Sequence, residues 1–94
     1  MPEYLLEFYI SATEPELAVE HGRSVRDAVD LLTAQGMPVH YRRSMFVTAD
    51  ETYFVLLEAE SLDAVRETAR LAQVSCDRVA AVSHAVSFDQ RESS

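Results

Sequence analysis

The spacing of hydrophobic residues along this chain alternates between two residues, as in a strand, and about 3.6 residues, as in a helix. The order of these segments is the sequence feature that most constrains the fold. Residues 3–11 alternate an apolar row with a mixed row, as a half-buried strand does. Residues 39–47 and 52–60 are rich in β-branched and aromatic side chains, and a short polar link joins them. Residues 79–86 form a last apolar segment of the same kind. Four strands are therefore predicted.

Two segments between these strands have helical spacing instead. Thr13, with a glutamate three residues later, matches a capping box that begins the first helix, and Gly36 fits a left-handed residue that ends it. Gly22 lies inside this segment and costs about 1 kcal/mol relative to alanine, so a kink or two shorter helices is an open alternative. Ser61 fits the N-cap of a second helix, which we expect to end near Ala72.

The resulting β-α-β-β-α-β order predicts an α+β, ferredoxin-like sandwich. Connection rules give an antiparallel sheet in the spatial order 4-1-3-2, with strands numbered along the chain and both helices on one face. We expect a single domain over residues 1–86 and a polar C-terminal tail over residues 87–94. The expected core comprises Tyr4, Leu6, Phe8, Val25, Val29, Leu32, Val65 and Ala69.

Hydrophobic residues also occupy the sheet face that the helices leave open. The expected apolar set on that face is Leu5, Tyr9, Phe46, Phe54 and Leu56. A patch of this size is larger than a monomer usually exposes. We therefore expect a homodimer that packs through the open sheet face.

Composition excludes several classes of function. Sixteen acidic residues against eight arginines give a formal charge of −8, which disfavours nucleic acid and anionic membranes as partners. The sequence contains no apolar run of the ~20 residues that a membrane-spanning helix needs. The single cysteine, Cys76, cannot form an internal disulfide, so the chain suits the reducing cytoplasm. It also rules out a cysteine-rich zinc site, and we interpret Cys76 as a small buried hydrophobic residue. Glycine-rich loops and the common hydrolase and metalloprotease motifs are also missing.

The two central segments are expected to pair as a hairpin whose outward rows match. This register predicts the cross-strand pairs His40 with Glu58, Arg42 with Leu56, and Ser44 with Phe54.

The same topology indicates a candidate metal site at one end of the sheet. We expect His40, Glu58, Glu7 and His84 to converge there, and imidazole with carboxylate suits nickel, zinc, copper or cobalt ions. Two simpler interpretations stay open: Glu58 could pair with Arg42, and His40 could be a solvated residue at a strand end. The outward or inward direction of His84 is ambiguous because both rows of its segment are small and apolar. We expect the remaining histidine, at position 21, to be exposed on its helix.

Several stretches of the chain resemble a known family. The segments GMPVHYRRSMFVTADETYFVLLEAES and LDAVRETARLA resemble the small bacterial nickel-binding proteins of ferredoxin-like fold, and the similarity extends over residues 2–86. The resemblance implies a homodimer joined through open sheet faces, nickel binding, and matching acidic positions at Glu7 and Glu58. The cysteine that the family often carries is replaced here, where Tyr53 and Val55 flank Phe54. Histidine and carboxylate are therefore the ligands left to bind a metal.

Three functions are consistent with these patterns. The first is a small cytoplasmic protein that binds nickel or another divalent transition metal for storage or buffering, with the site residues acting as ligands. The second is a dimeric enzyme of the monooxygenase or cyclase type, with a pocket between sheet and helices and with Tyr9, His40 or His84 transferring protons. The third is a structural or regulatory dimer without a pocket or ion.

Overall fold

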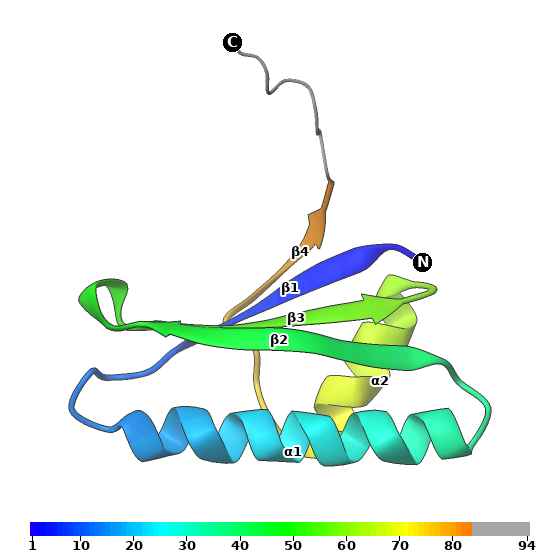
Figure 1. Ribbon diagram of the computed structural model, residues 1–94, viewed down its shortest axis with the longest axis horizontal. Coiled ribbons are helices and arrows are strands. Elements are labelled where there is room, and N and C mark those ends of the chain that lie inside the picture. Colours follow the sequence, from blue (N-terminus) through cyan, green and yellow to red (C-terminus); the bar gives the residue numbers. More distant parts are fainter. Residues whose placement is uncertain (84–94) are drawn as a thin grey trace, which may run out of the picture.

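The computed structural model describes residues 1–83 and shows an α+β protein with four strands and two helices (Figure 1). In chain order the elements are β1 (Glu3–Tyr9), α1 (Pro15–Ala34), β2 (Val39–Val47), a short 3-10 turn η1 (Thr48–Asp50), β3 (Thr52–Ala59), α2 (Leu62–Ala72) and β4 (Arg78–Val82). The end predicted for the last strand and the tail over residues 87–94 lie outside the described residues. Within residues 1–83, neither helix is long and apolar enough to cross a bilayer.

The strands form one sheet in the order β2-β3-β1-β4, and every neighbouring pair is antiparallel. Figure 1 shows α1 running alongside β2, with α2 on the same side of the strands. Burial along β3 alternates accordingly: Tyr53, Val55 and Leu57 are buried, whereas Phe54 and Leu56 stay partly exposed. The architecture is consistent with the predicted ferredoxin-like fold, with one sheet face covered by helices and one left open.

Helix α1 begins differently from the prediction. Its N-cap is Glu14, without a side-chain hydrogen bond, and the Thr13 hydroxyl lies 2.8 Å from that of Ser11 instead of capping the helix. The predicted capping box is therefore wrong. Pro15 in the first turn explains why a cap is less needed, because proline has no N–H to satisfy and its fixed φ already suits a helix.

The other end of α1 agrees with the prediction. Gly36 has a φ of +91°, and its N–H donates to the carbonyl of Thr33 at 3.1 Å. The N–H of Met37 donates to the carbonyl of Leu32 at 2.9 Å. These two bonds form a Schellman motif, in which a left-handed residue lets the chain satisfy the last helical carbonyls. The predicted glycine C-cap is confirmed.

Helix α2 also starts as predicted. The Ser61 hydroxyl accepts a hydrogen bond from the N–H of Ala64 at 3.2 Å. The helix ends at Ala72, and Gln73 follows with a φ of 58°. Residues other than glycine adopt this left-handed backbone conformation at a cost in free energy.

Most of the predicted core is confirmed. Six of its members are buried: Leu6, Phe8, Val25, Val29, Leu32 and Val65. Tyr4 is only partly buried against this cluster. Thr68, rather than Ala69, is the fully buried residue in the second half of α2, where its hydroxyl donates to the carbonyl of Ala64 at 2.8 Å. That bond satisfies a polar group that would otherwise be costly to bury.

Strand β2 contains a bulge that the sequence pattern did not reveal. His40 pairs with Glu58 as predicted, but the register then shifts between Tyr41 and Arg43, which leaves Arg42 as an extra residue. One inserted residue sends every later side chain to the opposite face. The predicted pairs of Arg42 with Leu56 and Ser44 with Phe54 are therefore wrong. The observed pairs are Arg43 with Leu56 and Met45 with Phe54.

Phe46 changes sides for the same reason. It pairs with Tyr53, a residue of the helix-facing row, and their rings meet edge to face at a centroid distance of 6.4 Å. Phe46 therefore lies on the helix side of the sheet, not on the open face as predicted, and Met45 takes the outward position.

Candidate functional site

Three side chains of a kind that can bind a metal ion lie in one row across the sheet. His40 of β2 pairs with Glu58 of β3, and Glu58 pairs with Glu3 of β1. Directly opposed side chains in a sheet have Cβ atoms about 5 Å apart, so each neighbour in this row is within reach of the next. The structure thus brings together His40 and Glu58 as predicted, and adds Glu3, which the sequence analysis did not single out.

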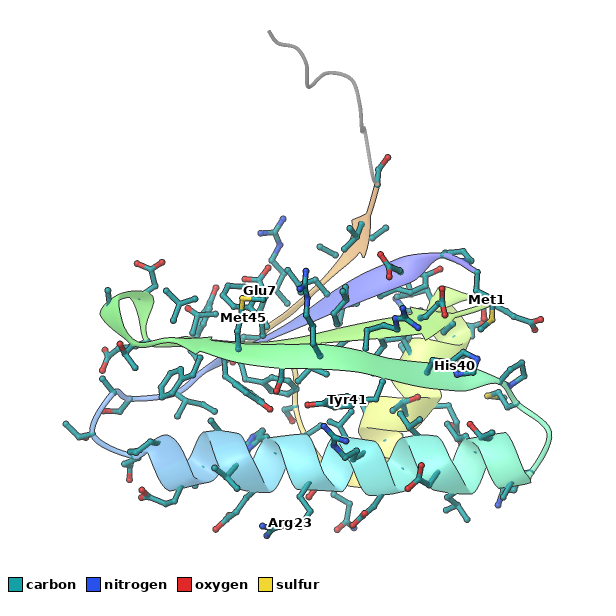
Figure 2. The ribbon with its side chains drawn as sticks, in the orientation of Figure 1. Met1, Glu7, Arg23, His40, Tyr41 and Met45 are labelled. Atoms are coloured by element: carbon teal, nitrogen blue, oxygen red, sulfur yellow. The ribbon has the colours of Figure 1, made fainter. Side chains whose placement is uncertain are left out.

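Glu7 lies elsewhere. It pairs with Phe54 on one side and Arg78 on the other, four positions along β1 from Glu3. That separation is about 13 Å along a strand. Figure 2 accordingly shows Glu7 near Met45 and far from His40. Its carboxylate is 3.5 Å from the guanidinium of Arg78. The structure therefore does not bring Glu7 to the end where His40 lies, and His84 lies outside the described residues.

The charge of Glu58 is partly balanced by a neighbour. The Nη1 atom of Arg42 lies 3.8 Å from Oε1 of Glu58, which is the simpler pairing that the sequence analysis left open. His40 is exposed. Within residues 1–83, no three His, Cys, Asp or Glu side chains are close enough together to hold a metal ion. Residues 1–83 therefore bring His40 and Glu58 together as direct neighbours, with Glu3 on the other side of Glu58, and a bound ion would need further ligands.

A cleft of about 500 Å³ lies between the N-terminal half of α1 and strands β2 and β3. Its apolar wall includes Ala18, Val19 and Phe46, and its polar side includes the hydroxyl-bearing residues Tyr41, Ser44 and Tyr53. Among residues 1–83, no histidine lines this cleft. The bulge of β2 is what turns Ser44 and Phe46 toward this cleft.

Gly22 explains how two tyrosines fit beneath α1. A Cβ atom at this position would lie 2.4 Å from the Tyr53 hydroxyl and 3.5 Å from that of Tyr41. The helix continues without a break through Gly22, so it is not divided into two shorter helices. A glycine in the interior of a helix is the signal in the sequence for this close approach.

The hydroxyl groups of Tyr41 and Tyr53 lie 3.5 Å apart. Burial raises the pKa of Tyr53 to about 12, with a further rise from Tyr41 and an opposing effect of the Ser44 hydroxyl. Tyr53 therefore keeps its proton at neutral pH and can donate it in a hydrogen bond. The guanidinium of Arg26 lies over the Tyr41 ring, 4.3 Å from the ring centroid, which is a cation–π contact.

Two other residues from the sequence analysis have structural roles. His21 is partly buried, with Nδ1 2.8 Å from the carbonyl oxygen of Leu17 and its ring edge-on to Phe8, so the prediction of an exposed histidine is wrong. Cys76 packs partly buried against the core. Burial, followed by the charge of Asp77, raises the pKa of its thiol to about 11, which leaves it protonated and unreactive at neutral pH.

The open face of the sheet carries an apolar patch with a shallow hollow of about 200 Å³. We call it the open-face patch; it comprises Leu5, Met45, Phe54, Leu56 and Val82. Arg43 borders the same hollow. Tyr9, farther along β1, is 66% exposed. The patch sits in the middle of the face, with the His40–Glu58 pair at one end of it.

Comparison with known proteins supports the fold. The crystal structure of SCO4226 from Streptomyces coelicolor A3(2) superposes with a TM-score of 0.52 at 18% sequence identity, covering 85% of this chain and 94% of that one. At this identity the likeness shows a shared small α+β fold and nothing about function. No protein-family model matches the chain, and no curated protein matches it.

Proposed function

We propose that this protein is a homodimeric metal-binding protein that takes up a divalent transition-metal ion, nickel first, at the end of the sheet where His40 and Glu58 meet. The observation that carries the proposal is the register of β2 and β3, which makes an imidazole and a carboxylate direct neighbours on the open face. The preference for nickel comes from the resemblance described above.

The donors available define the kind of binding. Imidazole nitrogen and carboxylate oxygen suit borderline ions such as nickel, and water completes an octahedral shell. With so few protein ligands and no thiolate, we expect weak, exchangeable binding, which fits storage or buffering better than redox chemistry. Protons compete with the metal for the imidazole, so binding weakens as the pH falls. A single cysteine fits a reducing compartment, so we place this function in the cytoplasm.

A second copy of the chain is part of the proposal. Neither helix of residues 1–83 covers the open-face patch, and packing two such faces about a twofold axis would bury it. The same axis would duplicate the His40–Glu58 pair. The partner's donors could then supply ligands that a single copy lacks.

The test is calorimetric titration of nickel into the wild-type protein and four variants at one fixed pH above neutrality. We expect His40→Ala and Glu58→Gln each to weaken binding about tenfold or more, because each removes a proposed protein ligand. His84→Ala tests the fourth predicted ligand. Glu7→Gln is the matched control: it removes a carboxylate from the same face at a distance from His40, and should bind as the wild type does.

Two outcomes would overturn the assignment. One is the absence of nickel binding below millimolar concentrations. The other is equal binding by the wild type, His40→Ala and Glu58→Gln. In either case the structural or regulatory dimer becomes the better interpretation.

A further inference from the structure

We propose that the cleft between α1 and strands β2 and β3 is a second binding site, and that it takes a small aromatic carboxylate. The inference does not depend on the proposed metal function, because neither His40 nor Glu58 lines this cleft. It rests on the volume of the cleft, on its apolar wall and on the polar groups gathered at one side.

The apolar wall suits a flat ring. A volume of about 500 Å³ lies within the range of sites that hold small organic molecules. Phe46 and the ring of Tyr53 stand edge to face at the sheet side of the cleft. Val19 on α1 is 59% exposed at the helix side, an apolar side chain in contact with water. A bound ring would cover Val19 and Phe46 together, which is favourable at roughly 25 cal/mol per Å² of apolar surface removed from water.

The polar side suits a group that accepts hydrogen bonds. Tyr41, Ser44 and Tyr53 each bring a hydroxyl to it, and the missing side chain of Gly22 lets the two tyrosine hydroxyls pack close beneath α1. The oxygens of Tyr41 and Tyr53 are 3.5 Å apart, at the outer limit of a hydrogen bond, so their mutual contact is weak. The Tyr41 hydroxyl can therefore turn its proton toward an acceptor on a ligand, and the Tyr53 hydroxyl lies beside it with Ser44 as a further hydrogen-bond partner.

The charge at the cleft favours an anion. Arg26 lines the cleft, and its guanidinium is fixed over the Tyr41 ring. No ion pair links Arg26 to a carboxylate within residues 1–83, although the chain carries a net charge of −8. Arg23 also borders the cleft, but Figure 2 shows its side chain directed away from the sheet. Arg26 is thus the cation that a ligand carboxylate would meet, beside the tyrosine hydroxyls.

The test uses benzoate and its neutral analogue benzamide, two probes of nearly equal shape that differ in charge. Each is titrated into nitrogen-15-labelled protein while the backbone amide signals are followed by NMR. We expect benzoate to shift the signals of Gly22, Ser44 and Phe46 in a saturable way. Benzamide should bind about tenfold more weakly, because it lacks the charge-assisted contact with Arg26.

Two variants separate this site from general charge effects. Arg26→Gln should lower the affinity for benzoate about tenfold and leave that for benzamide nearly unchanged. Arg66→Gln, an exposed arginine on α2 outside the cleft, is the matched control and should behave as the wild type. The proposal is overturned if benzoate causes no saturable shifts, if the shifts map to the open face, or if Arg26→Gln binds benzoate as tightly as Arg66→Gln does.

Discussion

Arg42 is the residue whose charge matters most for the proposed metal site. It is the extra residue of the β2 bulge, and its guanidinium lies 3.8 Å from Glu58. A bound cation would compete with this guanidinium for the same carboxylate. The pair is partly exposed, so its worth is up to about 1 kcal/mol, or roughly fivefold in affinity. We therefore predict that Arg42→Gln strengthens nickel binding by up to about fivefold, as measured by calorimetry.

The control for this variant is Arg78→Gln. Arg78 forms a similar ion pair with Glu7, at 3.5 Å, away from His40. The Arg78→Gln variant removes the same charge from the molecule as Arg42→Gln does. Because its ion pair lies away from His40, it should change nickel affinity much less. Equal effects of the two variants would mean that net charge, rather than the Arg42–Glu58 contact, controls binding.

Single residues also show how far the sequence could predict the site. The opposition of His40 and Glu58 follows from hairpin pairing alone and was predicted correctly. The position of Glu7 depends on the register between β1 and β3, which are far apart in the chain and have no turn to fix their alignment. The tyrosine pair under Gly22 depends on how closely α1 approaches the sheet, a distance that periodicity does not contain.

At the scale of elements, the order and type of the strands and helices were predictable because each segment buries one face. The bulge in β2 was not, because alternation in the sequence looks the same whether or not one residue is skipped. Met45 and Phe46 are adjacent hydrophobic residues, so either could have been placed outward. The structure places Phe46 against Tyr53 and thereby creates the sheet side of the cleft.

The end of α2 offers a prediction at this scale. Gln73 occupies a left-handed conformation with a φ of 58°, where glycine avoids the steric cost of a Cβ atom. We expect Gln73→Gly to raise the free energy of unfolding by about 0.5–1 kcal/mol, measured by urea denaturation.

Gln35 at the end of α1 provides the matched control. It has a φ of −88°, which any residue adopts easily, so Gln35→Gly gains nothing in the folded state and adds freedom to the unfolded chain. That variant should be less stable than the wild type. A loss of stability in Gln73→Gly as well would show that the left-handed conformation is not strained.

At the scale of the whole molecule, the two proposed sites lie on opposite faces of the sheet, because the helices cover only one of them. The cleft lies on the helix side, and the His40–Glu58 pair lies on the open side beside the open-face patch. A dimer formed through the open face would therefore leave the cleft accessible in both copies. Occupation of the cleft and metal binding should then be independent of each other.

The last prediction concerns the dimer itself. Sedimentation of the wild-type protein should give about twice the chain mass of 10.6 kDa at micromolar concentrations. Leu56, which pairs with Leu5 and Arg43, lies in the open-face patch and outside the helix-facing core. Leu56→Glu would place a charge in a dry interface, so it should yield a folded monomer. Leu31→Glu is the control, because Leu31 is an equally apolar, 47% exposed residue on α1, and it should stay dimeric. A wild-type monomer, or equal dissociation of the two variants, would show that the open face is not the dimer interface.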